Sequence, residues 1–145
     1  MRNLVSRAKI LKCFGYQAAS TTAITAASEV DMKGFEACTF ILTLGTMVNL
    51  SSVTATVYHG NTSGDLSASV AASGAVISDG TDGTQIVIEV VKPLYRYLRL
   101  GVVIAAQNAV VENIIAIVTG PRDEPVTQDD AVISDDIFVS PATAT

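Results

Sequence analysis

The stretch FEACTFILTL, residues 35–44, decides the fold class of this chain. Its side chains alternate with a period of two, so that one face carries the apolar residues Cys38, Phe40, Leu42 and Leu44. That period is typical of a β-strand, in which successive side chains point to opposite faces of the sheet. The other face, with Ala, Thr and Ile side chains, is also fairly apolar. We therefore expect this strand to lie in the centre of a sheet.

Further segments carry β-strand patterns, and turn-forming clusters of Gly, Asn, Asp and Ser separate several of them. These segments are residues 52–59, 84–91, 94–104 and 109–119. The last two are joined only by residues 105–108, and so short a connection predicts a hairpin between them. No long helical pattern intervenes. The sequence therefore predicts an all-β fold, an antiparallel β-sandwich or jelly roll.

Changes in charge and composition divide the chain into three parts. We expect residues 1–28 to form a basic N-terminal arm, extended or helical depending on its contacts, residues 29–120 to form the β-sandwich domain, and residues 121–145 to form an acidic, extended C-terminal tail. A chain of 145 residues suits one core, because it buries roughly two thirds of its unfolded surface. The tail keeps apolar residues, which we expect to dock on the chain's own domain, on a second copy or on another protein: Ile137, Phe138 and Val139.

The two ends of the chain carry opposite charges. Residues 123–136 contain acids and no base, whereas residues 1–12 contain no acid and the bases Arg2, Arg7, Lys9 and Lys12. Such ends can pair within one chain, pair between neighbouring copies, or stay solvated. The sequence leaves these alternatives open.

Composition argues against several functions. The net charge is −5 and the pI is about 4.6, whereas a general nucleic-acid binder needs a surplus of Lys and Arg on one face. We expect neither a membrane span nor a secretion signal, because the long uncharged runs alternate with Thr and Ser. A single His and two Cys without Cys-x-x-Cys spacing give too few ligands for a transition-metal site. We expect no cofactor, and free thiols at Cys13 and Cys38.

One turn contains the residue types of nucleophilic catalysis. His59 lies close in the chain to Ser63 and Asp65. Any turn rich in Ser, Gly and Asp supplies these types by accident, and no Gly-x-Ser-x-Gly elbow is present. We therefore expect this protein not to be an enzyme.

One expected strand combines aromatic and basic side chains, at Tyr95, Arg96, Tyr97 and Arg99. Such a strand can stack on and neutralise a single-stranded nucleic acid. The acidic balance of the chain, and the lack of a second strand of this kind, favour protein contact or cross-strand pairing instead.

Short phrases spread over roughly residues 29–128 are the most distinctive part of the sequence: Val30-Asp31-Met32, Gly34-Phe35-Glu36, Lys92-Pro93-Leu94-Tyr95-Arg96-Tyr97-Leu98-Arg99, Ala109-Val110-Val111-Glu112, Ile114-Ile115-Ala116-Ile117, Gly120-Pro121-Arg122 and Pro125-Val126-Thr127. In these phrases the chain resembles small virion proteins of tailed bacteriophages, which are described as decoration, cement or head-stabilisation proteins. The resemblance consists of short matching phrases spread over a whole domain, and it includes no catalytic motif. It does not extend to the N-terminal arm or to the tail beyond Gln128.

The resemblance implies a structural virion protein that binds the outside of the assembled phage capsid and stabilises the shell by bridging capsid subunits. Its implied partners are the major capsid protein and other copies of itself, as a homo-oligomer and most often a trimer, with no nucleic acid and no membrane. Its implied place is the capsid surface, after synthesis in the host cytoplasm. The candidate capsid or subunit contacts are Arg2, Arg7, Lys9, Lys12, Tyr95, Arg96, Tyr97, Arg99, Ile137, Phe138 and Val139.

Two other functions fit a small β domain with extended ends. One is a neck or tail component, such as a head-completion or tail-terminator protein, which differs from a decoration protein in its copy number. The other is a β-sandwich that recognises host-surface carbohydrate. That function favours exposed Trp or Tyr platforms, and this chain has no Trp.

Overall fold

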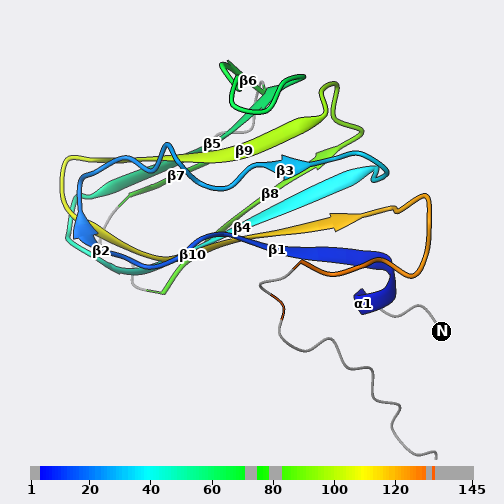
Figure 1. Ribbon diagram of the computed structural model, residues 1–145. Helices are drawn as coiled ribbons and strands as arrows, with labels where there is room; N and C mark the ends of the chain where they lie inside the picture. The colour runs from blue at the N-terminus through cyan, green and yellow to red at the C-terminus, as the bar shows by residue number, and fades with distance from the viewer. Residues whose placement is uncertain (1–3, 71–74, 79–82, 130–131, 133–145) are drawn as a thin grey trace, which may run out of the picture.

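The chain folds into two antiparallel β-sheets that pack face to face (Figure 1). A computed structural model describes residues 4–70, 75–78, 83–129 and 132. Within these residues each sheet has five strands, and the helical part is α1 (Leu4–Arg7). The predicted all-β sandwich is confirmed.

Sheet A contains, in spatial order, β1 (Ala8–Phe14), β10 (Ala109–Thr119), β4 (Ala37–Met47) and β8 (Gln85–Val91), and β2 (Gln17–Ser20) also pairs with β10. Sheet B contains β3 (Val30–Asp31), β9 (Tyr97–Ala105), β5 (Ser52–Gly60) and β6 (Ala68–Ser69), and β7 (Ala75–Ser78) also pairs with β5. Both sheets direct one face into a shared core.

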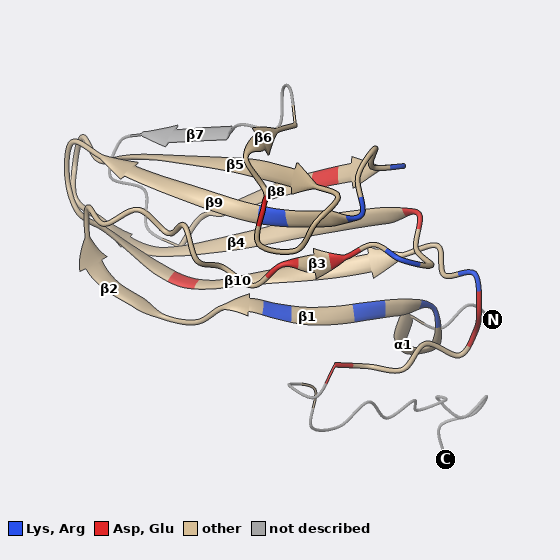
Figure 2. Ribbon diagram, turned by 45° about the horizontal axis from the view of Figure 1, so that its top comes forward, with Lys and Arg blue, Asp and Glu red and all other residues tan. Residues whose placement is uncertain are grey.

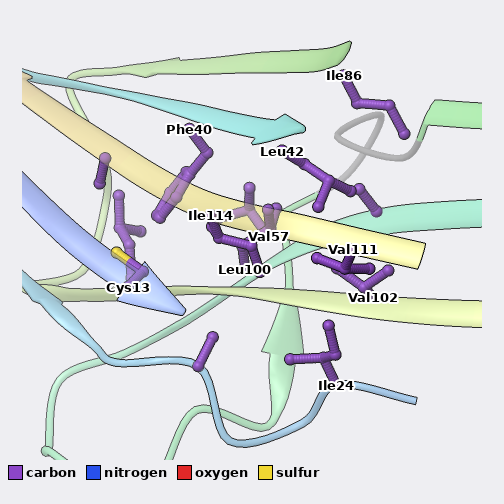
Figure 3. Close-up of a cluster of buried hydrophobic side chains, with 14 of the residues drawn as sticks. Cys13, Ile24, Phe40, Leu42, Val57, Ile86, Leu100, Val102, Val111 and Ile114 are labelled. Atoms are coloured by element: carbon purple, nitrogen blue, oxygen red, sulfur yellow. The ribbon is translucent and has the colours of Figure 1, made fainter. Parts of the chain in front are cut away.

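The stretch that decides the fold lies in β4, between β10 and β8, so its predicted central position is confirmed. Its inward side chains, Cys38, Phe40, Leu42 and Leu44, are fully buried. Facing side chains from sheet B, including Val57, Leu100 and Val102, complete the same cluster (Figure 3). Burying one large aliphatic side chain contributes about 1.5–3 kcal/mol, so this alternation is the main source of stability.

The predicted hairpin between residues 94–104 and 109–119 is wrong. Strand β9 pairs with β5 and β3 in sheet B, whereas β10 pairs with β1 and β4 in sheet A. The connecting turn, with Ala106 at a φ of 66°, carries the chain from one layer to the other. A short connection fixes only that two strands are near each other, and here they face each other across the core instead of lying side by side.

The predicted N-terminal arm, residues 1–28, does not stay apart from the sandwich, because residues 8–20 supply β1 and β2 of sheet A. The same part of the chain places Ala8, Cys13, Ile24 and Ala27 in buried positions. The physical reason is that β10 has a free side for another strand, and β1 pairs along it from Ala8 opposite Thr119 to Phe14 opposite Ile114. The sandwich therefore begins near residue 8.

After β10 the chain turns back and runs beside β1, as the orange segment in Figure 1 shows. The Val126 N–H donates to the Ser6 carbonyl at 3.0 Å. The Gln128 side chain continues the contact: its Nε2 donates to the Val5 and Ala8 carbonyls, each at 2.7 Å, and its Oε1 accepts from the Ile10 N–H at 3.0 Å. Residues 124–128 thus cover α1 and the first part of the outer edge of β1, at Ala8 and Ile10.

Candidate functional site

Segments that are far apart in the sequence meet at one end of the sandwich. Residues 32–36, residues 92–96 and Arg122 line an open groove of about 460 Å³. A second groove of about 280 Å³ adjoins it through Lys33, Gly34 and Phe35 and is completed by residues between Pro121 and Thr127. We call this region the end surface. It is built largely from the short distinctive phrases of the sequence, around residues 30–36, 92–99 and 120–127.

Backbone hydrogen bonds fix the end surface. The Lys92 N–H donates to the Glu36 carbonyl at 2.7 Å, and the Met32 N–H donates to the Arg96 carbonyl at 2.8 Å. The Arg122 N–H donates to the Gly34 carbonyl at 2.9 Å. Gly34 has a φ of 86°, a left-handed conformation that glycine adopts without strain, and this turn brings residues 32–36 within reach of the other two segments.

An ion pair holds Arg96 in place on this surface. Its Nε and Nη2 donate to the two carboxylate oxygens of Asp31 at 2.8 and 2.7 Å, a bidentate geometry. The hydrogen bond from Arg96 lowers the pKa of Asp31 below its ordinary value. The guanidinium carbon also lies 4.9 Å from the centre of the Tyr97 ring. Because both partners are nearly half exposed, the pair orients Arg96 more than it stabilises the fold.

The end surface combines charge with one exposed apolar side chain. Among the described residues, Lys33, Lys92 and Arg122 make no salt bridge, although Glu36 and Asp123 also line the two grooves. Figure 2 shows charges of both signs at this end of the sandwich. Leu94 is 78% exposed beside them. A rim of charged groups around an exposed leucine is typical of surfaces that contact other proteins.

The structure separates the predicted contact residues. Tyr95 and Arg96 line the first groove and Lys9 lines the second, but Tyr95 and Arg96 precede β9 instead of lying in it. Arg99 lies further along β9 and donates to the Leu66 carbonyl at 3.5 Å. Lys12 is exposed on the outer face of sheet A.

Of the two oppositely charged ends, one pair forms within the chain. The Nε of Arg7 lies 2.8 Å from the Glu124 carboxylate, and both side chains are about 40% exposed. The remaining candidates, Arg2, Ile137, Phe138 and Val139, lie outside the described residues.

Sequence reasoning missed Lys33 and Arg122 as members of the surface, and it missed Leu94 as its exposed apolar residue. Two of the three stand inside the distinctive phrases, and Lys33 stands between two of them. Those phrases were therefore the available signal.

The described residues show no catalytic pairing at His59. Its ring packs edge-on against Tyr95, with ring centres 4.5 Å apart, while the Ser63 hydroxyl donates to the Glu29 carboxylate at 2.8 Å. Among the residues that the structure describes, no three His, Cys, Asp or Glu side chains group as metal ligands. The same residues include no helix long and apolar enough to cross a membrane.

The two cysteines are free, as predicted, and both are buried. Burial raises the pKa of the Cys13 thiol to about 11 and that of Cys38 to about 12. Both therefore remain neutral thiols at physiological pH, a form that is a poor nucleophile and a poor metal ligand.

No protein-family model matches this chain, and no curated protein matches it. Among solved structures, a chain of infectious bursal disease virus, Gx strain, is similar with a TM-score of 0.48 and 15% identity over 80% of this chain. A chain of the Gt strain is similar with a TM-score of 0.47 and 13% identity over 83% of this chain. This chain spans about one third of each of those chains, 32% and 34%. A likeness of this size carries no information about function.

Proposed function

We propose that this chain is a structural virion protein that binds the outside of an assembled phage capsid and stabilises the shell by bridging capsid subunits. The observation that carries the proposal is the end surface. Phrases from three distant parts of the chain, all of which resemble phage decoration proteins, meet there around Leu94 and two adjoining grooves. The proposal assigns no catalytic role and no cofactor. Its partners are the major capsid protein and other copies of this chain, with a trimer as the expected oligomer.

The physical basis of such a function is linkage. A protein that binds the assembled lattice and not the separated subunits stabilises the lattice by its binding free energy. Each contact can be small, because many copies repeat it by symmetry and clustering raises the effective affinity. The end surface suits this role: it offers an apolar anchor, Leu94, with cations around it that add charge complementarity.

The second candidate is a neck or tail component, which the small β-sandwich also favours. The two candidates differ in copy number, with hundreds of copies expected for a decoration protein and about a dozen or fewer for a connector.

A rebinding experiment tests the proposed surface. Phage heads that lack this chain are mixed with purified wild type or with a variant, and bound chain is measured after sedimentation of the heads. We expect Leu94→Asp to weaken binding about tenfold or more, the scale of an interface anchor. Leu50→Asp is the matched control, because Leu50 is also a highly exposed leucine, at 69%, in the turn after β4 at the other end of the sandwich. Equal binding by wild type and Leu94→Asp contradicts the proposed surface.

The stabilising role has its own readout. Heads saturated with wild type are expected to release their DNA at a higher temperature than bare heads, whereas heads mixed with Leu94→Asp behave as bare heads. Wild-type binding without any change in release temperature contradicts the stabilising role while leaving the surface intact.

A further inference from the structure

Strand β8 is the other edge of sheet A, and among the described residues its outer side has no strand beside it. Two of its side chains, Val87 and Val91, are 59% and 62% exposed. An edge of this kind presents a row of backbone N–H and C=O groups that can pair with another strand.

The hydrogen-bonding phase of β8 identifies which backbone groups face outward. At one end the Lys92 N–H donates to the Glu36 carbonyl on the β4 side, and at the other end the Thr84 carbonyl accepts from the Leu44 N–H. The register between β4 and β8 is regular in between. Because alternate residues of a strand direct their backbone groups to opposite sides, the even-numbered residues bond to β4. The outward groups belong to Gln85, Val87, Glu89 and Val91.

The outer side of β8 lacks the features that commonly protect an edge. Natural edge strands carry lysines, prolines or bulges that block pairing. Residues 85–91 contain no Pro and no Lys, their register with β4 shows no shift, and Glu89 is their single charge. The edge is thus regular, and within the described part of the chain it is open to a partner strand.

We propose that β8 pairs with β8 of a second copy, antiparallel, about a two-fold axis at Ile88. In this register Val87 lies opposite the partner's Glu89, and Gln85 lies opposite the partner's Val91. Every outward backbone group of Gln85–Val91 then has a partner, and two copies of sheet A form one continuous sheet.

Charge selects this register over its neighbour. A two-fold axis at Glu89 places that carboxylate directly opposite the partner's Glu89, and like charges at directly opposed positions destabilise a sheet. An axis at Val87 leaves Val91 outside the paired segment. The axis at Ile88 avoids both, so the strand is complementary to itself.

This contact is independent of the capsid proposal. A two-fold contact between identical surfaces closes as a dimer. The trimer implied by the family resemblance therefore requires a different surface, and β8 pairing could join such trimers in pairs.

The test is the dimer dissociation constant of the full chain, measured by analytical ultracentrifugation. Because Val87 lies opposite the partner's Glu89 in two symmetric places, Val87→Glu is expected to weaken the dimer about threefold to tenfold or more, and Val87→Lys is expected to tighten it by a similar factor. The tightening is expected to fade at high salt. Val103→Glu and Val103→Lys are the matched controls, since Val103 is a 52% exposed valine in β9 that pairs with Thr54 of β5, next to the bridge between Ile24 and Val102.

Amide hydrogen exchange supplies a second readout. In the dimer the N–H groups of Val87 and Glu89 are expected to exchange slowly, and on dilution to the monomer they exchange fast while Ile88 remains protected by β4. A chain truncated after Val132 is expected to remain a dimer. A monomer at all concentrations, equal effects at Val87 and Val103, or loss of the dimer on truncation would each overturn the proposal, the last by identifying the C-terminal segment as the occupant.

Discussion

The two edges of sheet A are treated differently by the same chain. At β1, residues 124–128 fold back, and the Gln128 side chain bonds to three backbone groups of residues 5–10. At β8, the outward groups of Gln85–Val91 have no neighbouring strand within the described residues. The first part of the β1 edge, at Ala8 and Ile10, is thereby covered by the chain itself, whereas no described segment covers the β8 edge. With the pairing proposed above, sheet A has one side that its own chain seals and one side that contacts a second copy.

The largest expected difference is in packing, between the centre of sheet A and its β8 edge. Ile114, in the strand beside β1, is fully buried, whereas Ile88 in β8 is only partly buried against the core. Ile114→Ala is expected to lower the free energy of unfolding by about 2–5 kcal/mol, and Ile88→Ala by clearly less. Urea unfolding of both variants measures this. An equal loss at the two sites would mean that β8 is packed as firmly as the central strand β10.

The next prediction concerns the hydrogen bonds between Gln128 and the start of β1. Gln128→Ala leaves the Ile10 N–H and the Val5 and Ala8 carbonyls without their side-chain partner, and we expect a loss of about 1–3 kcal/mol in the free energy of unfolding. The control is Gln85→Ala on β8, whose exposed amide makes one bond of 3.3 Å to Thr43. That change is expected to cost less than about 0.5 kcal/mol. If both substitutions are neutral, Gln128 does not seal the edge.

Sealing also predicts a change in self-association. Without Gln128 the β1 edge becomes a second open edge, so Gln128→Ala is expected to form larger species than the wild type at high concentration. Light scattering after size-exclusion chromatography measures the mass. A wild-type mass profile for this variant would show that the backbone contact of Val126 suffices to close the edge.

The smallest effect lies at β3, the short edge of sheet B, where Asp31 pairs with Arg96. Because this hydrogen bond lowers the pKa of Asp31 in the folded state, its contribution is present above the unfolded pKa, near 3.8, and is lost as pH falls through the lower folded value. The exposure of the pair keeps the contribution small. Carbon NMR titration of the Asp31 carboxyl in wild type and in Arg96→Ala measures the shift, which is expected to shrink in the variant because Arg96 is its largest cause.

The period-two patterns predicted β4, β5, β8 and β10 to within a few residues, because burial of one face leaves a direct trace in the sequence. Which strands pair with each other leaves no comparable pattern in the sequence. The last two strands were therefore assigned to a hairpin, although they lie in different sheets. In residues 8–14 the pattern is blurred, since Lys9 and Lys12 interrupt it at a sheet edge, so β1 was taken for an arm.

The end surface could be predicted only in part. Tyr95 and Arg96 were singled out by residue type, but their meeting with Lys33 and Arg122 depends on backbone hydrogen bonds between distant segments. The meeting of these segments follows from the strand topology, which a single sequence does not reveal. The seal at β1 depends on Gln128 in the same way, because nothing local distinguishes this glutamine from a solvated one.

The central claim is that this chain coats a capsid, and its copy number tests that claim most directly. Quantitative mass spectrometry of purified virions gives the ratio of this chain to the major capsid protein. We predict a ratio near one copy per capsid subunit. About a dozen copies per particle would contradict it and assign the chain to the neck or tail, and absence from virions would contradict any structural role in the particle.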